Sequence, residues 1–240
     1  ERGPRRAVSF AFPDMIRNWR HDWNEPQMTF LAVQLAPFMA IKEQPSESTW
    51  AELREAQLLA TKILKVGIAV ITDVGDPKNI HPTKKQPVGA RLAIAARGIA
   101  YGEPIEYSGP VFKKMKIDGD KAILSFDHVG KGLVARDGDL KGFAICGDDH
   151  KFVWAKAVII GNEKTAQWNA DAGIISVSAS ASMSAGSKRT KIMVSSPDVQ
   201  HPVAVRYGWA DCPVVNLWNE DGLPATPFRT DDFPMITAGK

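Results

Sequence analysis

One histidine and two aspartates follow directly after an apolar run, in the segment 72–82. The run Val66–Ile71 is typical of a buried strand, and Asp73, Asp76 and His81 lie in the loop behind it. In an open α/β sheet, ligands bind and catalytic groups gather in the loops at the carboxyl ends of the strands. A histidine beside a carboxylate can act as a general base toward a nucleophile. The spacing therefore predicts the base half of a hydrolytic site in this loop.

The bulk composition describes a globular chain without a strong charge. Of 240 residues, 44% are hydrophobic and 24% charged, and the formal net charge is +3. The basic residues are scattered, which argues against nucleic acid as a partner. No apolar stretch approaches the roughly 20 residues of a membrane helix, and Glu1–Arg6 carries no signal-peptide core. Cys146 and Cys212 are expected to be free, buried thiols, although one disulfide between them is neither required nor excluded.

The first hundred residues read as alternating helix and strand, which is the pattern of a parallel α/β layout. Apolar spacing and short polar signals at the starts of helices set the expected elements. In chain order these are a helix over 14–23 with Asp14 as N-cap, a buried strand over 28–36, a helix begun by a Thr49–Glu52 capping box and running to Lys65, a buried strand over 66–74, and a helix with a Thr83–Gln86 capping box that ends near Tyr101.

The second half changes character at Tyr107–Pro110, where short β-like runs begin to alternate with turn signals such as Asp118-Gly119. Strands are expected over 121–126, 142–146, 152–160, 191–195 and 203–209. The stretch 165–189 is low in complexity and is expected to be an insertion. The expected domains are thus an α/β unit over 1–106 and a β-rich, sandwich-like module over 107–240.

Several strings resemble one known family in the same order. The block Asn79-Ile80-His81-Pro82, followed by Lys85-Gln86 and Val88-Gly89, looks like the C-terminal active-site block of the sialate O-acetylesterases, which are carbohydrate esterases of the SGNH type. The resemblance covers nearly the whole chain apart from its two ends and the insertion. The other matching strings lie at 12–20, 33–38, 50–57, 107–110, 140–143, 203–207 and 227–231.

This resemblance implies a fold and an activity. The fold would be the C-terminal half of a flavodoxin-like SGNH hydrolase core followed by a β-sandwich-like module. The activity would be removal of O-acetyl groups from sugars such as sialic acid or a polysaccharide, without cofactor or metal, in the periplasm or outside the cell. A serine would attack the acetyl carbonyl, a histidine would take its proton, and an oxyanion hole would stabilise the tetrahedral intermediate.

The resemblance maps only part of that machinery onto this sequence. His81 matches the catalytic histidine of the family. The family commonly carries its acid two or three residues earlier, where Asn79 and Lys78 stand here, so Asp76 is the preferred candidate, with Asp73 or a backbone carbonyl as alternatives. The family's Gly-x-Ser-Asn and Gln-Gly-Glu-x-Asn blocks, which supply the nucleophile and the oxyanion hole, have no counterpart in this sequence. The serines at 9, 108, 125 and 176–187 lie in other contexts.

Two function classes therefore stay open: an acetylesterase portion built around His81, or a catalytically inactive fragment that binds glycans or another partner. Some polar and aromatic residues have two interpretations. Gln34, Arg54 and Gln57 could position substrate or form a structural network. Tyr207, Trp209 and Trp218 could stack on sugar or pack in the core. His128 and His150 do not have the spacing of a metal site.

Overall fold

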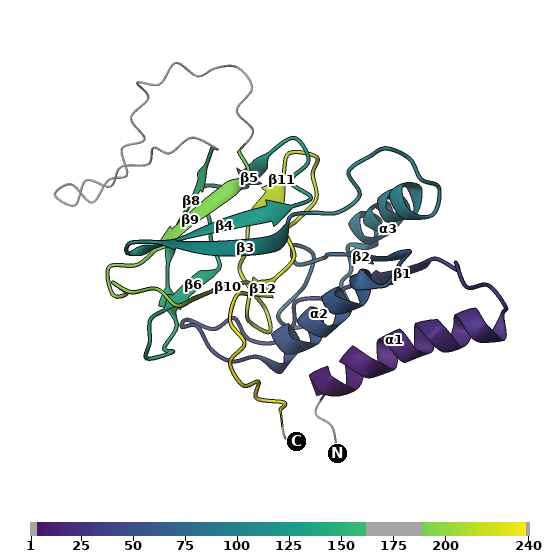
Figure 1. Ribbon diagram of the computed structural model, residues 1–240, viewed down its shortest axis with the longest axis horizontal. Coiled ribbons are helices and arrows are strands. Elements are labelled where there is room, and N and C mark those ends of the chain that lie inside the picture. Colours follow the sequence, from purple (N-terminus) through teal and green to yellow (C-terminus); the bar gives the residue numbers. More distant parts are fainter. Residues whose placement is uncertain (1–3, 162–188, 239–240) are drawn as a thin grey trace.

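A computed structural model describes residues 4–161 and 189–238 of the chain. In that part, helices occur only before residue 100, and strands β3 to β12 follow (Figure 1). The elements are α1 (Pro4–Asp22), β1 (Phe30–Val33), α2 (Thr49–Leu59), a 3-10 turn (Ala60–Lys62), β2 (Val66–Ala69), α3 (Lys85–Ile99), β3 (Val111–Asp118), β4 (Lys121–Asp127), β5 (Leu133–Ala135), β6 (Phe143–Cys146), β7 (Val153–Trp154), β8 (Lys156–Ile160), β9 (Lys191–Ser195), β10 (Ala204–Tyr207), β11 (Leu217–Asn219) and β12 (Phe228–Arg229).

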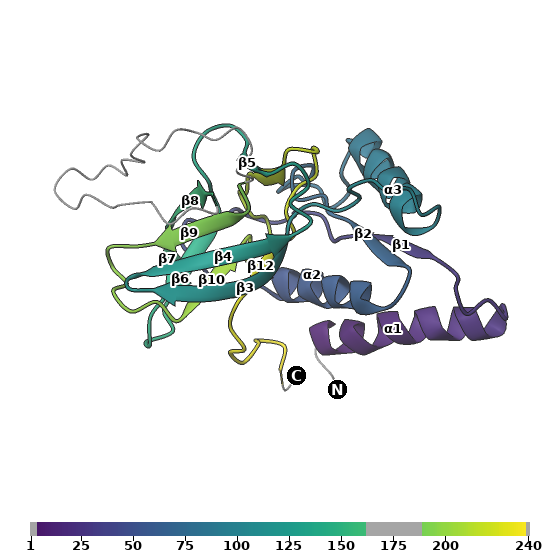
Figure 2. The same ribbon diagram turned by 45° about the horizontal axis from the view of Figure 1, so that its top comes forward.

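The first part of the chain is a parallel strand–helix–strand unit. β1 and β2 pair in parallel, from Phe30 opposite Val66 to Val33 opposite Ala69, and α2 connects them. Figure 2 shows α1 and α2 on one side of this pair and α3 on the other. The expected mixed α/β organisation with parallel strands is confirmed. The loop from β2 to α3, which carries Asp73, Asp76 and His81, therefore leaves the carboxyl end of a parallel strand.

α1 differs from the helix expected over 14–23. It begins at Pro4 and continues through Pro13, so Asp14 lies inside the helix and pairs with Arg17 instead of capping an end. The helix is anchored by Ile16, which is fully buried against Ala60 and Val66. Of the apolar residues whose spacing predicted this helix, only Ile16 is buried, while Met15, Trp19 and Trp23 are exposed. The spacing therefore predicted the helix but not its buried face or its extension upstream.

Both expected capping boxes are wrong. Ser48, not Thr49, is the N-cap of α2, and its hydroxyl oxygen accepts the N–H of Ala51 at 3.0 Å. The Glu52 carboxylate, free of any capping role, instead accepts the backbone N–H of Ile236 at 2.8 Å. α3 begins after Lys84 without a side-chain cap. A tertiary partner for Glu52 thus replaced the local interaction that the sequence pattern suggested.

The first strand is shorter and less buried than expected. All four residues of β1 are half-buried. The N–H of Gln34 still bonds the carbonyl of Ala69 at 2.9 Å, but the next N–H, that of Leu35, bonds the side-chain oxygen of Gln57 at 2.8 Å. A side chain of α2 therefore takes over from the neighbouring strand at this point, and the pairing stops.

The second part contains two four-stranded antiparallel sheets, β3-β4-β9-β8 and β12-β10-β6-β7, and a small pair β11-β5. The expected strand over 152–160 splits at Ala155, because β7 pairs with β6 in one sheet and β8 with β9 in the other. Four strands, β3, β5, β11 and β12, were not expected. β3 is an edge strand with four Lys and Asp side chains among its eight mostly exposed residues, so it shows little apolar alternation.

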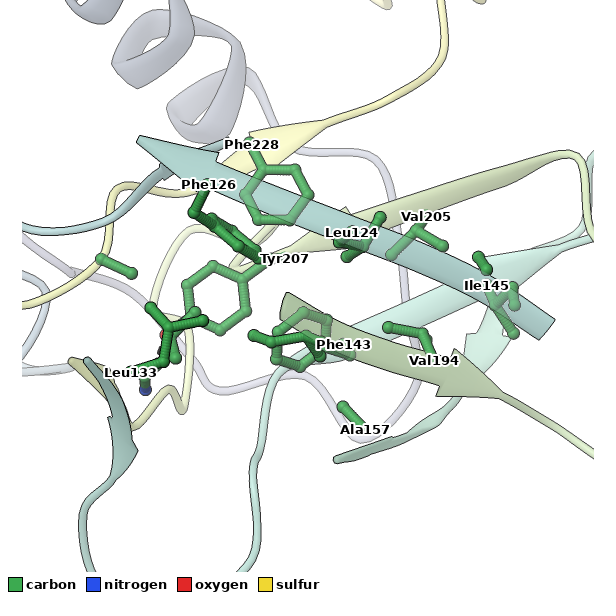
Figure 3. Packing of buried hydrophobic residues seen from close by; sticks show 14 of the residues in the cluster. Leu124, Phe126, Leu133, Phe143, Ile145, Ala157, Val194, Val205, Tyr207 and Phe228 are labelled. Carbon is green, nitrogen blue, oxygen red and sulfur yellow. Dashed lines mark hydrogen bonds between the residues drawn. The ribbon is translucent and has the colours of Figure 1, made fainter. Parts of the chain in front are cut away.

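One hydrophobic core joins the two sheets. Leu124 and Phe126 of β4 meet Phe143 and Tyr207 from the other sheet, and Phe228 stacks on Tyr207 with ring centroids 5.7 Å apart (Figure 3). Burial of such large side chains contributes about 1.5–3 kcal/mol each to the free energy of unfolding. This core holds β6 and β10 against β4 and β9 of the other sheet. The expected insertion at 165–189 lies outside the described residues, except for Arg189.

A row of alternating charges crosses from the helical part to the β-rich part. The Asp231 side chain is fully buried and accepts hydrogen bonds from Arg206 at 2.9 Å and from Arg229 at 3.0 Å. Arg206 also contacts Glu47 at 2.7 Å, and Arg229 contacts Glu55 at 3.1 Å. Glu47 precedes α2 and Glu55 belongs to it. Arg206 lies in β10, Arg229 lies in β12, and Asp231 follows β12. Buried ion pairs of this kind fix the orientation of the two parts.

Candidate active site

The loop that follows β2 is held from below by close backbone packing. Gly75 lies against Pro37, and a Cβ atom at position 75 would stand 2.5 Å from the Pro37 carbonyl oxygen. Ile71 and Val74 are buried together with Ala36. The loop is thus seated on the segment that leaves β1, and glycine is required at position 75 because a side chain has no room there.

Asp73 is committed to a structural ion pair. Both of its carboxylate oxygens accept from the guanidinium of Arg91 on α3, at 2.6 and 2.8 Å. Arg91 also donates to the carbonyl of Val70 at 2.8 Å. A bidentate pair of this geometry is strong and directional. Asp73 therefore fastens the loop to α3, and each of its carboxylate oxygens is bonded to Arg91.

Two side chains shape the turn that presents His81. Asp76 Oδ1 accepts the N–H of Lys78 at 2.8 Å, and Asn79 Oδ1 accepts the N–H of His81 at 2.9 Å. Such Asx turns substitute a side-chain acceptor for a backbone one and favour tight loops. Asp76 and Asn79 thus give the segment its conformation. A purely turn-forming role for Asp76 remains one interpretation beside its role as the acid.

His81 is exposed at the rim of this loop, and in the described part of the chain no hydrogen bond joins its imidazole to Asp76 or to any serine. Asp76 Oδ2 has no hydrogen-bond partner among the described residues. A carboxylate accepts on both oxygens, so the turn leaves one oxygen available. The structure brings His81 and Asp76 into one turn, and their catalytic roles stay predictions.

The serines of the described region lie elsewhere. Ser9 is in α1 and Ser125 in β4. The Ser108 hydroxyl donates to the Gly109 carbonyl at 3.0 Å, in the connection between the two parts. The serines at 176–187 lie outside the described residues. The structure therefore does not assign a nucleophile.

The polar residues Gln34, Arg54 and Gln57 form a structural network. Arg54, fully buried, donates to the carbonyls of Leu35 at 2.8 Å and Ala210 at 2.7 Å. It also reaches the carbonyls of Ala36 and Asp211. Burial lowers the pKa of Arg54 to about 10, opposed by the Asp211 carboxylate. The structure thus favours the structural interpretation, and this network fixes the segment on which the His81 loop rests.

Other residues singled out in the sequence also have structural roles. Tyr207 and Trp218 are buried in the β-rich part, at 0% and 5% exposure. His128 contacts Glu106 at 2.7 Å, and the ring of His150 stacks on Phe233. Cys146 and Cys212 are free and buried, as expected.

Neither a metal-binding cluster nor a membrane-spanning helix occurs in the described ranges. Within residues 4–161 and 189–238, no three His, Cys, Asp or Glu side chains gather closely enough to hold a metal ion. Each helix of that part is too short or too polar to cross a bilayer.

Around a cavity of about 200 Å³ in the β-rich part, sequence reasoning had offered Trp209 for sugar stacking but missed the other lining residues. Trp154, Phe152 and Arg206 line this cavity, and none of its lining residues belongs to the His81 loop. Trp154 is 44% exposed, so part of its side chain is open to solvent. The signal in the sequence was the aromatic pair at 152 and 154, which strand alternation places on one face.

The chain is similar to known proteins both in its sequence and in its fold. No protein-family model matches the chain. Sialate O-acetylesterases of Rattus norvegicus and Homo sapiens are each 28% identical to it, over 62% and 61% of this chain and 30% and 31% of their own lengths. That of Pongo abelii is 25% identical over 91% of this chain and 41% of its own length. A solved carbohydrate acetylesterase from Xanthomonas citri is 42% identical, with a TM-score of 0.79, over 94% of this chain and 46% of that one.

The fold and these matches make the chain a homologue of carbohydrate acetylesterases. More particularly, it is a distant homologue of the sialate O-acetylesterases, which confirms the resemblance seen in the sequence. The chain spans about a third of the length of the rat and human relatives and 46% of the solved chain.

Proposed function

We propose that this chain carries the histidine side of a carbohydrate acetylesterase site, with His81 as general base. The observation that supports the proposal is the placement of His81. It stands exposed at the carboxyl end of a parallel strand, on a loop braced by Asp73–Arg91 and by the packing of Gly75. Such a rigid support is what a catalytic side chain needs, and the homologues are carbohydrate acetylesterases.

The reaction would be acyl transfer in two steps. In the first, His81 removes the proton of a serine hydroxyl while the oxygen attacks the acetyl carbonyl, and the protonated imidazole then gives that proton to the departing sugar oxygen. In the second, the same imidazole takes a proton from water, which attacks the carbonyl of the acetyl-enzyme. The bond to the serine oxygen breaks, the imidazolium returns its proton to that oxygen, and acetate leaves. Asp76 would orient the imidazole through its Oδ2 atom while Oδ1 keeps the turn closed. Asp73 is a poorer candidate because Arg91 occupies both of its oxygens.

The finer parts of the fold and location belong to the same proposal. We place β1, β2 and their helices at the C-terminal end of a flavodoxin-like SGNH sheet, within a unit over residues 1–106. Residues 107–240 would form the sandwich-like module. The site of action would be the periplasm or the cell exterior, where acetylated sialic acids or polysaccharides are met. The comparisons support the carbohydrate class of the substrate through the homologues' activity.

Ester hydrolysis tests the role of His81 directly. The rate of acetate release from 4-nitrophenyl acetate and from acetylated xylo-oligosaccharides is measured for the chain and for His81→Ala. A matched control is His21→Ala, which removes an exposed histidine of α1. Loss of a general base lowers the rate about 10²–10⁴-fold, so saturable turnover is expected to fall by that factor in His81→Ala alone.

The same assay separates the two function classes. Rates that match free imidazole in all three proteins would refute ester hydrolysis by this chain. The second class, a module that binds glycan without chemistry, is favoured by one observation, the aromatic cavity beside Trp154.

The variants Asp76→Asn and Asp73→Asn test which acid orients His81. A tenfold or larger loss of the hydrolysis rate in Asp76→Asn, with Asp73→Asn destabilising the fold instead, would identify Asp76 as the orienting acid.

A further inference from the structure

Two adjoining cavities form a groove on the β-rich part, separate from the His81 loop. Their volumes are about 200 and 180 Å³, and both are lined by the same five residues. Together they reach the lower end of the roughly 300–1,000 Å³ of small-molecule sites. We call this the aromatic groove, and its shared lining residues are Pro45, Ser46, Gly142, Trp154 and Trp209.

The two tryptophans give the groove its apolar surfaces. Trp154, 44% exposed, is fixed by a hydrogen bond from its Nε1 to the Glu43 carbonyl at 2.7 Å. Trp209 is 8% exposed, and the guanidiniums of Arg206 and Arg229 lie 5.2 and 5.6 Å from its ring centroid. The indole N–H of Trp209 has no acceptor among the described residues. An unmet buried donor is uncommon in a purely structural position.

Polar groups stand beside these rings. Arg206, 4% exposed, lines one cavity and makes three hydrogen bonds, two to Asp231 and one to Glu47. A guanidinium has five N–H donors, so two remain without an acceptor in the described part of the chain. The side chain of Glu47 is 43% exposed, and only its Oε1 atom is bonded to Arg206. Donor and acceptor thus lie together next to a flat aromatic face.

The groove is continuous with the support of the His81 loop. Its far end is lined by Cys212. The neighbouring Asp211 accepts the N–H of Phe38 through its carbonyl at 3.3 Å, and Pro37 is the residue on which Gly75 packs. Burial raises the pKa of the Cys212 thiol, the Arg54 guanidinium opposes this effect, and the Asp76 carboxylate adds to it. Through Asp211 and Phe38, the groove therefore lies beside the segment that supports the loop of the candidate acid.

We infer that the aromatic groove binds sugar units of an oligosaccharide whose acetylated unit reaches the His81 loop. A pyranose ring presents an apolar C–H face that stacks on an aromatic ring and hydroxyls that pair with charged donors and acceptors. The exposed face of Trp154 and the Arg206–Glu47 pair supply both kinds of contact. This inference rests on the proposed function for the position of the acetyl group, but sugar binding in the groove does not require chemistry.

Calorimetric titration of the chain tests it with three unacetylated probes: xylohexaose, tetragalacturonic acid and α2,8-linked trisialic acid. The variants are Trp154→Ala, Trp154→Phe and, as a matched control, Trp23→Ala, which removes a 73% exposed tryptophan just beyond α1. We expect at least one probe to bind with a dissociation constant in the millimolar range or below. Loss of an aromatic stacking partner should weaken that binding about tenfold in Trp154→Ala, while Trp154→Phe stays within about threefold and Trp23→Ala is unchanged.

Three results would overturn the inference. They are the absence of binding for all probes, an equal loss in Trp154→Ala and Trp23→Ala, and a loss in Trp154→Phe as large as in Trp154→Ala. The last would mean that the bond to Glu43, and not the ring face, matters. Thermal unfolding of each variant shows that the fold is kept. Because the probes lack acetyl groups, a failure of esterase activity does not affect this result, and a failure of binding leaves the His81 assay standing.

Discussion

Replacement of Arg54 by alanine should strongly destabilise the contact between the helical part and the β-rich part. We call this contact the seam; it includes the bonds of Arg54 to the carbonyls of Leu35 and Ala210 and the row of charges around Asp231. Of the four carbonyls that Arg54 contacts, two keep another donor: Ala36 from Trp50, and Asp211 from Phe38. The carbonyls of Leu35 and Ala210 have Arg54 as their donor and would be left without it.

The magnitude follows from those two carbonyls. A buried acceptor without a partner costs about 1–3 kcal/mol, so the pair predicts a loss of about 2–6 kcal/mol in the free energy of unfolding, from a total that is typically about 5–15 kcal/mol. The stability of Arg54→Lys should lie between those of the parent chain and Arg54→Ala, because a compact ammonium group cannot reach acceptors on both segments at once as the planar guanidinium does. The surface control Arg17→Ala should change stability by less than about 0.5 kcal/mol.

Urea unfolding followed by circular dichroism and tryptophan fluorescence measures these differences. The two signals report on helices and on buried indoles, so they also show whether both parts unfold together. A stability of Arg54→Ala within about 0.5 kcal/mol of the parent chain would refute the reasoning. It would mean that water or a backbone shift satisfies Leu35 and Ala210 without cost.

Two further perturbations follow from the seam and the loop. Burial disfavours the charged form of Asp231, but the hydrogen bonds and charges of Arg206 and Arg229 outweigh burial and lower the pKa of this carboxyl. The ionised Asp231 therefore stabilises the fold above the unfolded-state pKa of about 3.9, and this stabilisation is lost as the pH falls below that value. The free energy of unfolding, measured as a function of pH in acid, should show this loss, and Asp231→Asn should make the pH dependence weaker. Gly75→Ala places a Cβ 2.5 Å from a backbone oxygen and should lower the free energy of unfolding by about 1–3 kcal/mol. Gly89→Ala lies in open space on α3 and should raise the free energy of unfolding by about 0.5–1 kcal/mol, measured by the same urea unfolding.

Local signals in the sequence located the loop but not what surrounds it. The apolar run 66–71 and the acidic turn behind it predicted where His81 would stand, because strand burial and turn chemistry are local properties. The strand over 191–195 and the turn at Asp118-Gly119 were also located correctly for that reason. The resemblance to one family added the reaction class, which no local property could have supplied.

What the sequence could not show depends on long-range partners. Glu52 resembled a capping residue until its partners, Ile236 and Thr237, were seen almost the whole chain away. Trp209 and Trp154 are alike in composition, and only the packing of the sheets shows that one is enclosed and the other half open. The acid of the candidate site stayed ambiguous because the choice between Asp73 and Asp76 depends on which carboxylate Arg91 occupies.

The alternating row of charges at the seam has a consequence for how such a chain can evolve. Asp231 separates two arginines that are themselves buried. If the acid were lost alone, two buried guanidiniums would lose the carboxylate that lies between them and would keep only Glu47 and Glu55 at the ends of the row. Removing one partner of a buried ion pair is strongly destabilising. The row should therefore be inherited or replaced as a group across related sequences. Trp154 is not a member of this row. If it stacks on sugar, as proposed above, it can be replaced alone while the charge row stays fixed.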